Sequence, residues 1–306
     1  MHDDAQGRLV DIGDTALFVV ERGAGDGYPL VLLHGGPGDD HHEFGDYLDP
    51  LGDRHRLILV DQRGQGRSGE SNSTTWTLQQ MAADVVLLAR ALPLERYAVL
   101  GHSYGAFVTL QSAVDFPGMA SQSIVSGGLP SAHWLAGLEA KLAAFEPEDL
   151  RELVRRSWEK ETEVATEEEF AAIMREQMPW HFADPRDPRI EEYERRSAGA
   201  RYAPDVLRVF AQAAYGGIDL ENRLGEIEHA VLVLAGRHDR TCPVEASELM
   251  AKEIPRAELV VFEHSGHMTF VEEQDRYVEA VRDFLDRHTA EEDPGASTPT
   301  DTGPAS

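Results

Sequence analysis

Three residues in the chain order serine, aspartate, histidine have the side chains needed for nucleophilic catalysis. Ser103 lies at the centre of Gly-His-Ser-Tyr-Gly, Asp239 ends Gly-Arg-His-Asp, and His267 ends Ser-Gly-His. A serine hydroxyl is a weak nucleophile at neutral pH, so an imidazole must take its proton and a carboxylate must orient that imidazole. We therefore predict that Ser103 is a nucleophile, His267 its general base and Asp239 the orienting acid.

The stretch 97–108 predicts the sharp turn that such a serine requires. It begins as an apolar, strand-like run, passes through Ser103, and continues with apolar residues at helical spacing. Gly101 and Gly105 stand where larger side chains would collide in so tight a turn. The alternative is a glycine-rich connection in which the serine only caps the helix.

A second glycine-rich segment predicts an oxyanion hole. His34-Gly-Gly-Pro-Gly38 follows the buried, strand-like run 29–33. We expect the Gly36 and Tyr104 N–H groups to hold the oxyanion, with Gly35 beside them as a substrate contact. The alternative is an ordinary glycine turn. In the loop that follows the run 56–61, Asp61 and Arg63 are expected to brace this segment through an ion pair and backbone hydrogen bonds.

The remaining pattern predicts an α/β fold with a mostly parallel sheet flanked by helices, because strand-like runs alternate with helical ones. Ser103, Asp239 and His267 each follow a strand-like run, and sites in such sheets form at the carboxyl ends of strands. The runs 8–12 and 16–21 predict an edge hairpin, and the motif at Thr77 predicts a capping box that opens a helix. Further predicted strands cover 121–126, 230–235 and 257–263, and further predicted helices cover 243–254 and 275–287.

The pattern changes between residues 129 and 228, where helices and acidic clusters replace strands. We predict helices over 131–145, 147–161, 166–178 and about 205–214, with a loop over 178–185 in which Trp180 contacts substrate. This region is interpreted as a helical lid inserted into one α/β core formed by residues 1–128 and 229–288. Residues 289–306 are rich in Pro, Gly, Ser, Thr and acids and are expected to be a disordered acidic tail.

Composition restricts the possible partners. The 306 residues include 28 basic and 55 acidic side chains, and the net charge of −27 disfavours binding to nucleic acid or anionic membranes. One cysteine allows no intrachain disulfide, and His41 and His42 are adjacent rather than at the helical spacing of a metal motif. We expect no metal or cofactor, a small-molecule or short-peptide substrate, and a monomer or small homo-oligomer. A polar start without an apolar segment suggests a cytoplasmic protein.

These motifs together resemble the α/β-hydrolase superfamily and, within it, the proline iminopeptidase group of serine peptidases. The resemblance spans roughly residues 16–285. It implies removal of an N-terminal residue, often proline, from short peptides or amino-acid amides through an acyl-enzyme, with acidic residues in or near the lid holding the substrate's free amino group. The motifs that carry it are His34-Gly-Gly-Pro-Gly38, Asp61-Gln-Arg-Gly64, Gly101-His-Ser-Tyr-Gly105, Gly236-Arg-His-Asp239 and Gly266-His267.

Two positions depart from that group. His102 stands where its members commonly carry glycine, and a histidine there is frequent among esterases. Arg240 stands where some members place a glutamate that binds the substrate amine, and a cation would repel that amine. A lid-bearing carboxylesterase, amidase or lactonase with the same triad is therefore the alternative. A non-catalytic ligand-binding relative is a further alternative from another class.

Overall fold

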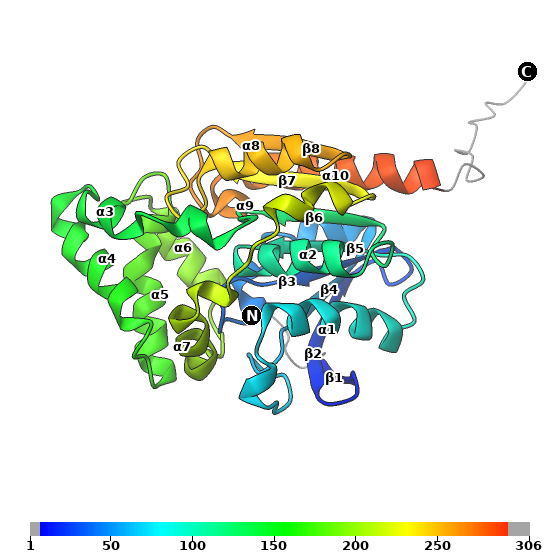
Figure 1. Ribbon diagram of the computed structural model, residues 1–306, viewed down its shortest axis with the longest axis horizontal. Helices are drawn as coiled ribbons and strands as arrows, with labels where there is room; N and C mark the ends of the chain where they lie inside the picture. The colour runs from blue at the N-terminus through cyan, green and yellow to red at the C-terminus, as the bar shows by residue number, and fades with distance from the viewer. Residues whose placement is uncertain (1–6, 293–306) are drawn as a thin grey trace, which may run out of the picture.

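The computed structural model describes residues 7–292, and an eight-stranded sheet lies at its centre (Figure 1). The strand order is β1-β2-β4-β3-β5-β6-β7-β8. The edge hairpin of β1 and β2 is antiparallel, β2 is antiparallel to β4, and every other pair is parallel, which confirms the predicted mostly parallel sheet. The strands are β1 (Arg8–Asp11), β2 (Ala16–Gly23), β3 (Tyr28–Leu33), β4 (His55–Asp61), β5 (Ala98–His102), β6 (Gln122–Ser126), β7 (Ala230–Gly236) and β8 (Ala257–Phe262).

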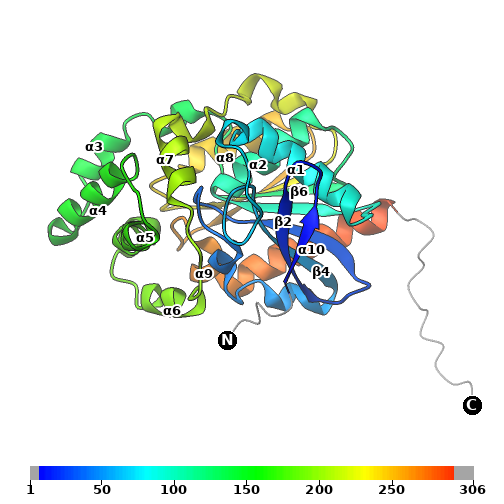
Figure 2. The same ribbon diagram turned by 90° about the horizontal axis from the view of Figure 1, so that it is seen from below.

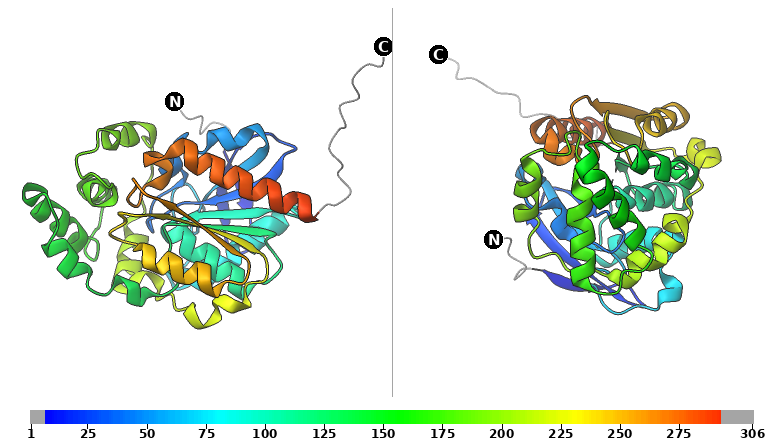
Figure 3. Two further views of the ribbon diagram at one scale, coloured as in Figure 1. Left: turned by 90° about the horizontal axis from the view of Figure 1, so that it is seen from above. Right: turned by 90° about the vertical axis from the view of Figure 1, so that its left-hand side faces the viewer.

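Helices cover both faces of the sheet, which explains why the central strands β5, β6 and β7 are buried along their whole length. In β3, Val31 and Leu33 pack with helices on one face, whereas Leu30 and Leu32 pack with the other layer. The first layer contains α1 (Leu78–Ala91), α2 (Tyr104–Asp115) and α8 (Val244–Glu253), and the second contains α9 (Thr269–Glu272) and α10 (Gln274–Glu292). Figure 3 shows α10 on the opposite side of the sheet from α2 and α8.

The start of α1 differs in detail from the prediction. Thr77 caps the helix by accepting a hydrogen bond from the Gln80 N–H at 3.1 Å. The Gln80 side chain donates forward to Asp84 Oδ1 at 3.0 Å instead of closing a capping box. The Thr77 cap is therefore present, but the Gln80 side chain binds the buried carboxylate of Asp84 and does not complete a capping box.

Helices fill the connection between β6 and β7, as predicted. This helical insertion (residues 127–229) contains α3 (Leu138–Ala143), α4 (Glu148–Lys160), α5 (Glu167–His181), α6 (Arg189–Arg196) and α7 (Pro204–Gln212). Figures 1 and 2 show these helices gathered at one end of the sheet. The predicted boundaries at 128 and 229 fall in the connections that join the insertion to β6 and β7.

Several predicted bounds in the insertion were wrong. The expected helix 131–145 is a 3-10 helix at Ala132–Leu135 followed by the short α3. Pro179 lies inside α5, which continues to His181, so the expected loop begins later. Helix α6 was not predicted; its sequence RIEEYERR is short and mostly charged, with Ile190 and Tyr193 as its apolar residues.

The last described helix is longer than expected. Helix α10 continues to Glu292, so the predicted disordered tail does not begin at Thr289. The remainder of that predicted tail, residues 293–306, lies outside the described residues. Among residues 7–292, no helix combines the length and the apolar character that a membrane crossing would need.

Candidate active site

Ser103 occupies a strained turn between β5 and α2. Its backbone angles are φ 53° and ψ −117°, a region that non-glycine residues seldom occupy. A Cβ on Gly101 would lie 2.0 Å from the Gly105 carbonyl oxygen, and one on Gly105 would lie 2.1 Å from the Leu33 carbonyl oxygen. Both glycines are thus required by close backbone packing, as the nucleophile-elbow interpretation expects.

Asp239 and His267 meet at the carboxyl ends of β7 and β8. Asp239 Oδ2 lies 2.6 Å from His267 Nδ1, and Asp239 Oδ1 accepts the Thr241 and Cys242 N–H groups at 2.8 Å each. Both side chains are buried. Because the Asp239 carboxylate faces Nδ1, it favours the tautomer with hydrogen on Nδ1 and leaves Nε2 able to accept a proton.

The glycine-rich segment lies against the nucleophile turn. Gly36 and Tyr104 line the same pocket as Ser103. Gly35 does not belong to that lining, contrary to our prediction that it contacts substrate: its N–H donates to Glu43 Oε2 at 2.6 Å, and a Cβ there would lie 2.9 Å from Ser103 Cβ. Gly35 is therefore needed for packing beneath the serine.

Asp61 makes the predicted backbone hydrogen bonds, but Asp61 and Arg63 do not pair with each other. Asp61 Oδ1 accepts the His41 N–H at 3.0 Å and so holds the segment that follows the glycines. Arg63 instead pairs with Asp84 and Asp14, each at 2.7 Å. Asp61 and Arg63, two residues apart, therefore bind different partners.

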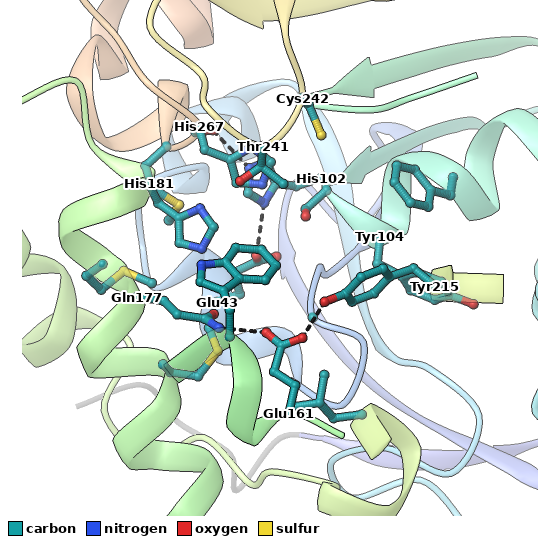
Figure 4. A pocket seen from close by; sticks show the side chains of 18 of the residues that line it. Glu43, His102, Tyr104, Glu161, Gln177, His181, Tyr215, Thr241, Cys242 and His267 are labelled. Atoms are coloured by element: carbon teal, nitrogen blue, oxygen red, sulfur yellow. Dashed lines mark hydrogen bonds and ion pairs between the residues drawn. The ribbon is translucent and has the colours of Figure 1, made fainter. Parts of the chain in front are cut away.

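Residues of the core and of the insertion line one pocket that contains Ser103, His102 and His267, and Figure 4 shows part of its lining. In the right-hand view of Figure 3, insertion helices lie in front of the core. Most of the wall is apolar, and its large side chains are Phe107, Leu135, Trp158, Phe170, Met174, Met178, Leu207 and Met268.

Trp180, which we expected to contact substrate, is not part of this wall. It is buried, packs with Leu142, Phe145 and Val154, and donates its indole N–H to Thr241 Oγ1 at 2.9 Å. The next residue, His181, faces the pocket instead. Its ring centroid lies 5.1 Å from that of His267, and burial lowers the pKa of His181 well below its ordinary value.

Sequence reasoning did not single out Glu161, a buried carboxylate in the pocket wall just beyond α4. Its oxygens accept from Gln177 Nε2 at 2.6 Å and from the Tyr215 hydroxyl, as Figure 4 shows. Burial raises the pKa of Glu161 to about 7, although these two hydrogen bonds oppose the rise. In the sequence, Glu161 looks like the surrounding acidic residues, because its burial depends on contacts with α5 and the segment after α7.

Arg240, which follows Asp239 in the sequence, does not line this pocket. Its guanidinium donates to the carbonyl oxygens of Trp180, Phe182 and Ala183 at 2.9, 2.6 and 3.0 Å. These carbonyls lie at the C-terminal end of α5, where a cation is favoured. The positive charge therefore anchors the insertion to the Asp239 loop and does not face the substrate space.

Two groups of possible metal ligands occur among the described residues. One consists of Asp40, His41 and His42, and the other of Asp239, Cys242 and His267. His42 Nδ1 already lies 3.0 Å from Asp40 Oδ1, and the second group contains the Asp239–His267 pair. Hydrogen bonds within the protein therefore already engage the side chains of Asp40, His41, His42, Asp239 and His267.

Comparisons with known proteins agree with this architecture. A family description of the alpha/beta hydrolase fold matches residues 28–274. The chain is 30% identical over 271 residues to a proline iminopeptidase of Heyndrickxia coagulans, covering 85% of this chain and 91% of that protein. It is also 27% identical over 279 residues to a putative carbamate hydrolase of a Caulobacter species, covering 90% and 98% respectively.

A solved structure gives the same result in three dimensions. A proline iminopeptidase-related protein from Thermus thermophilus superposes with a TM-score of 0.72 at 28% identity, covering 92% of this chain and 96% of that one. The sheet order, the strained serine turn and the family match lead to one conclusion: the chain belongs to the alpha/beta hydrolase fold family.

Proposed function

We propose that the protein is a serine hydrolase that releases N-terminal residues from short peptides or amino-acid amides. Ser103 Oγ attacks the carbonyl carbon while His267 Nε2 takes its proton. The Gly36 and Tyr104 N–H groups stabilise the oxyanion. His267 then protonates the leaving amine, and water activated by the same imidazole releases the acyl group from Ser103.

The observation that carries the aminopeptidase proposal is the unbalanced charge of Glu161. Glu43 in the pocket faces His102 at 2.9 Å, and Asp239 faces His267. The two hydrogen-bond partners of Glu161, Gln177 and Tyr215, are neutral. A substrate ammonium group would supply the missing counter-charge in an otherwise apolar wall, and a charged hydrogen bond of this kind contributes about 1.5–3 kcal/mol.

Two further observations support this assignment. The Arg240 guanidinium is bound to three carbonyl oxygens outside the pocket, so it does not oppose an ammonium group there. Several similar proteins, from Heyndrickxia coagulans and Clostridium botulinum among others, carry the name proline iminopeptidase.

A carboxylesterase or amidase with the same triad is the second candidate. It is favoured by the apolar wall and by the pKa of Glu161 near 7, since a neutral Glu161 would accept an uncharged substrate. The two functions share Ser103, Asp239 and His267 and differ in whether a free amine improves turnover.

A paired assay separates the candidates. Hydrolysis of proline p-nitroanilide is compared with that of N-acetylproline p-nitroanilide and a short p-nitrophenyl ester, with Ser103→Ala as the control. The aminopeptidase proposal predicts serine-dependent release from the free-amine anilide and little from its acetylated form. Turnover of the ester alone would establish the second candidate, and equal rates for Ser103→Ala and the unsubstituted protein would refute both.

A further inference from the structure

His102 and Glu43 form a buried pair directly beneath the proposed catalytic groups. His102 is the last residue of β5 and precedes Ser103, while Glu43 lies in the 3-10 helix His41–Phe44. His102 Nδ1 lies 2.9 Å from Glu43 Oε1, and the side chains are 1% and 6% exposed.

This pair touches both halves of the site. Glu43 Oε2 accepts the Gly35 N–H at 2.6 Å and so holds the segment that contains Gly36. His102 Nε2 lies 3.2 Å from the backbone carbonyl oxygen of His267, and the two rings lie 4.9 Å apart between centroids. One pair of side chains thus links the oxyanion segment, the nucleophile turn and the histidine loop.

The contacts also fix the number of protons on the pair. A backbone carbonyl can only accept, so the hydrogen bond to His267 requires a hydrogen on His102 Nε2. The contact between Nδ1 and the Glu43 carboxyl requires a second hydrogen. Two arrangements supply both hydrogens: an imidazolium beside a carboxylate, or a neutral imidazole beside a carboxylic acid that donates to Nδ1. An imidazole is a stronger base than a carboxylate by about two pKa units, and the Gly35 N–H that Glu43 Oε2 accepts also favours the ionised carboxylate. We therefore assign the pair as an imidazolium and a carboxylate.

We propose that Glu43 and His102 are positioning residues that hold the oxyanion segment and His267 in place against Ser103, and that the pair remains an imidazolium–carboxylate during turnover. The proposal rests on the function assigned above to Ser103 and His267. Neither member transfers a proton to the substrate, because both nitrogens of His102 are occupied by protein acceptors.

The pKa directions agree with this charge state. Burial alone lowers the pKa of His102, but the charge and hydrogen bond of Glu43 outweigh burial and raise it above 6.5. Burial alone raises the pKa of Glu43, and His102 outweighs that effect and lowers it. The other titratable groups that interact with the pair are His34, Asp39, His181, Tyr193, Asp239, His267 and Tyr277.

Two substitutions at Glu43 separate positioning from charge. In Glu43→Gln, the amide oxygen can accept from Gly35 and the amide NH₂ can donate to Nδ1 of a neutral His102, so every bridge is kept. Glu43→Ala removes both bridges. The probe is diethyl p-nitrophenyl phosphate: Ser103 Oγ bonds to phosphorus, p-nitrophenolate leaves, and the serine proton passes to His267. This probe has no amine and therefore does not depend on Glu161.

We expect Glu43→Ala to slow phosphorylation by about 100-fold, the effect of a misplacement of about 1 Å. Glu43→Gln should restore the rate to within a few-fold. The rate of the unsubstituted protein should fall at alkaline pH as the pair loses a proton, and Glu43→Gln should lack that fall. An unchanged rate in Glu43→Ala, or a Glu43→Gln variant as slow as Glu43→Ala, would overturn the proposal.

A spectroscopic measurement tests the charge state without reference to activity. Long-range ¹H–¹⁵N spectra, assigned with His102→Gln, should show His102 protonated on both nitrogens at pH 7.5 and a single neutral tautomer in Glu43→Gln. A neutral His102 in the unsubstituted protein would overturn the proposed charge state. If the probe reacts no faster than with Ser103→Ala, the serine mechanism itself fails, and these spectra still decide the charge state of the pair.

Discussion

The sheet edge and the helical insertion each supply one buried carboxylate to the site, but they hold it differently. Asp239 follows β7, and the N–H groups of the next residues bind its Oδ1 while His267 binds its Oδ2. Glu161 accepts hydrogen bonds from the side chains of Gln177 and Tyr215, which lie 16 and 54 residues further along the chain. Both of these side chains are neutral. The core carboxylate is thus balanced within the protein, whereas the insertion carboxylate lacks a counter-charge among these partners. This difference suits a fixed catalytic group beside a group that binds a charged substrate.

Substitution of Asp239, the carboxylate that His267 balances, should give the largest loss of turnover. Asp239→Asn keeps the size of the side chain but removes the charge that fixes the His267 tautomer, and we expect kcat to fall about 10⁴-fold. Steady-state kinetics with proline p-nitroanilide measures the change, and circular dichroism checks that the fold is kept. A loss of less than tenfold would remove Asp239 from the triad.

Substitution of Glu161, the carboxylate without a counter-charge among its partners, should affect only substrates that carry a free amine. Glu161→Gln should lower kcat/KM for free-amine substrates by about 10- to 100-fold, the equivalent of one charged hydrogen bond. Reaction with the amine-free phosphate probe should remain within a few-fold. Glu163→Gln, which changes an exposed acid just after α4, is the matched control. Equal losses with both kinds of reagent would show that Glu161 does not bind the amine.

Glu161→Gln should also change how the free energy of unfolding depends on pH. The pKa of Glu161 is raised from 4.5 to about 7 in the folded protein, so the unfolded chain ionises first as pH rises. Stability from this group is therefore lost between about pH 4.5 and 7, by about 3 kcal/mol. In denaturant unfolding, the free energy of unfolding of Glu161→Gln should fall less over this pH range. The variant should therefore be more stable relative to the unsubstituted protein at pH 8 than at pH 4. A pH-independent difference would contradict the raised pKa.

The smallest effect concerns the helix that carries His181. Thr166 and Glu169 form a reciprocal capping box at the start of α5, with both hydrogen bonds at 3.2 Å. Thr166→Ala should reduce the free energy of unfolding by about 1 kcal/mol. Thr162→Ala, in the exposed turn after α4, is the comparison variant and should change it by less than about 0.5 kcal/mol. Denaturant unfolding measures both. An effect no larger than that of Thr162→Ala would show that this cap adds little stability.

The fold and the proposed triad followed from the sequence because each depends on local signals. The strained turn at Ser103 needs Gly101 and Gly105 within two residues, and the loops with Asp239 and His267 directly follow buried strands. Strand runs buried on both faces are continuous and apolar, and the structure confirmed the mostly parallel sheet. In such a sheet, residues at strand ends come together whatever the intervening sequence.

Only the tertiary structure decided which residues of the insertion face the pocket. Trp180 and His181 are neighbours on α5, yet the first packs in the interior of the insertion and the second faces His267, because successive residues on a helix point about 100° apart. The burial of Glu161, the direction of Arg240 and the contact between Glu43 and His102, 59 residues apart, depend on how separate elements pack. Sequence periodicity gives the apolar face of each helix, whereas the position of the few polar groups on that face follows from the packing of its neighbours.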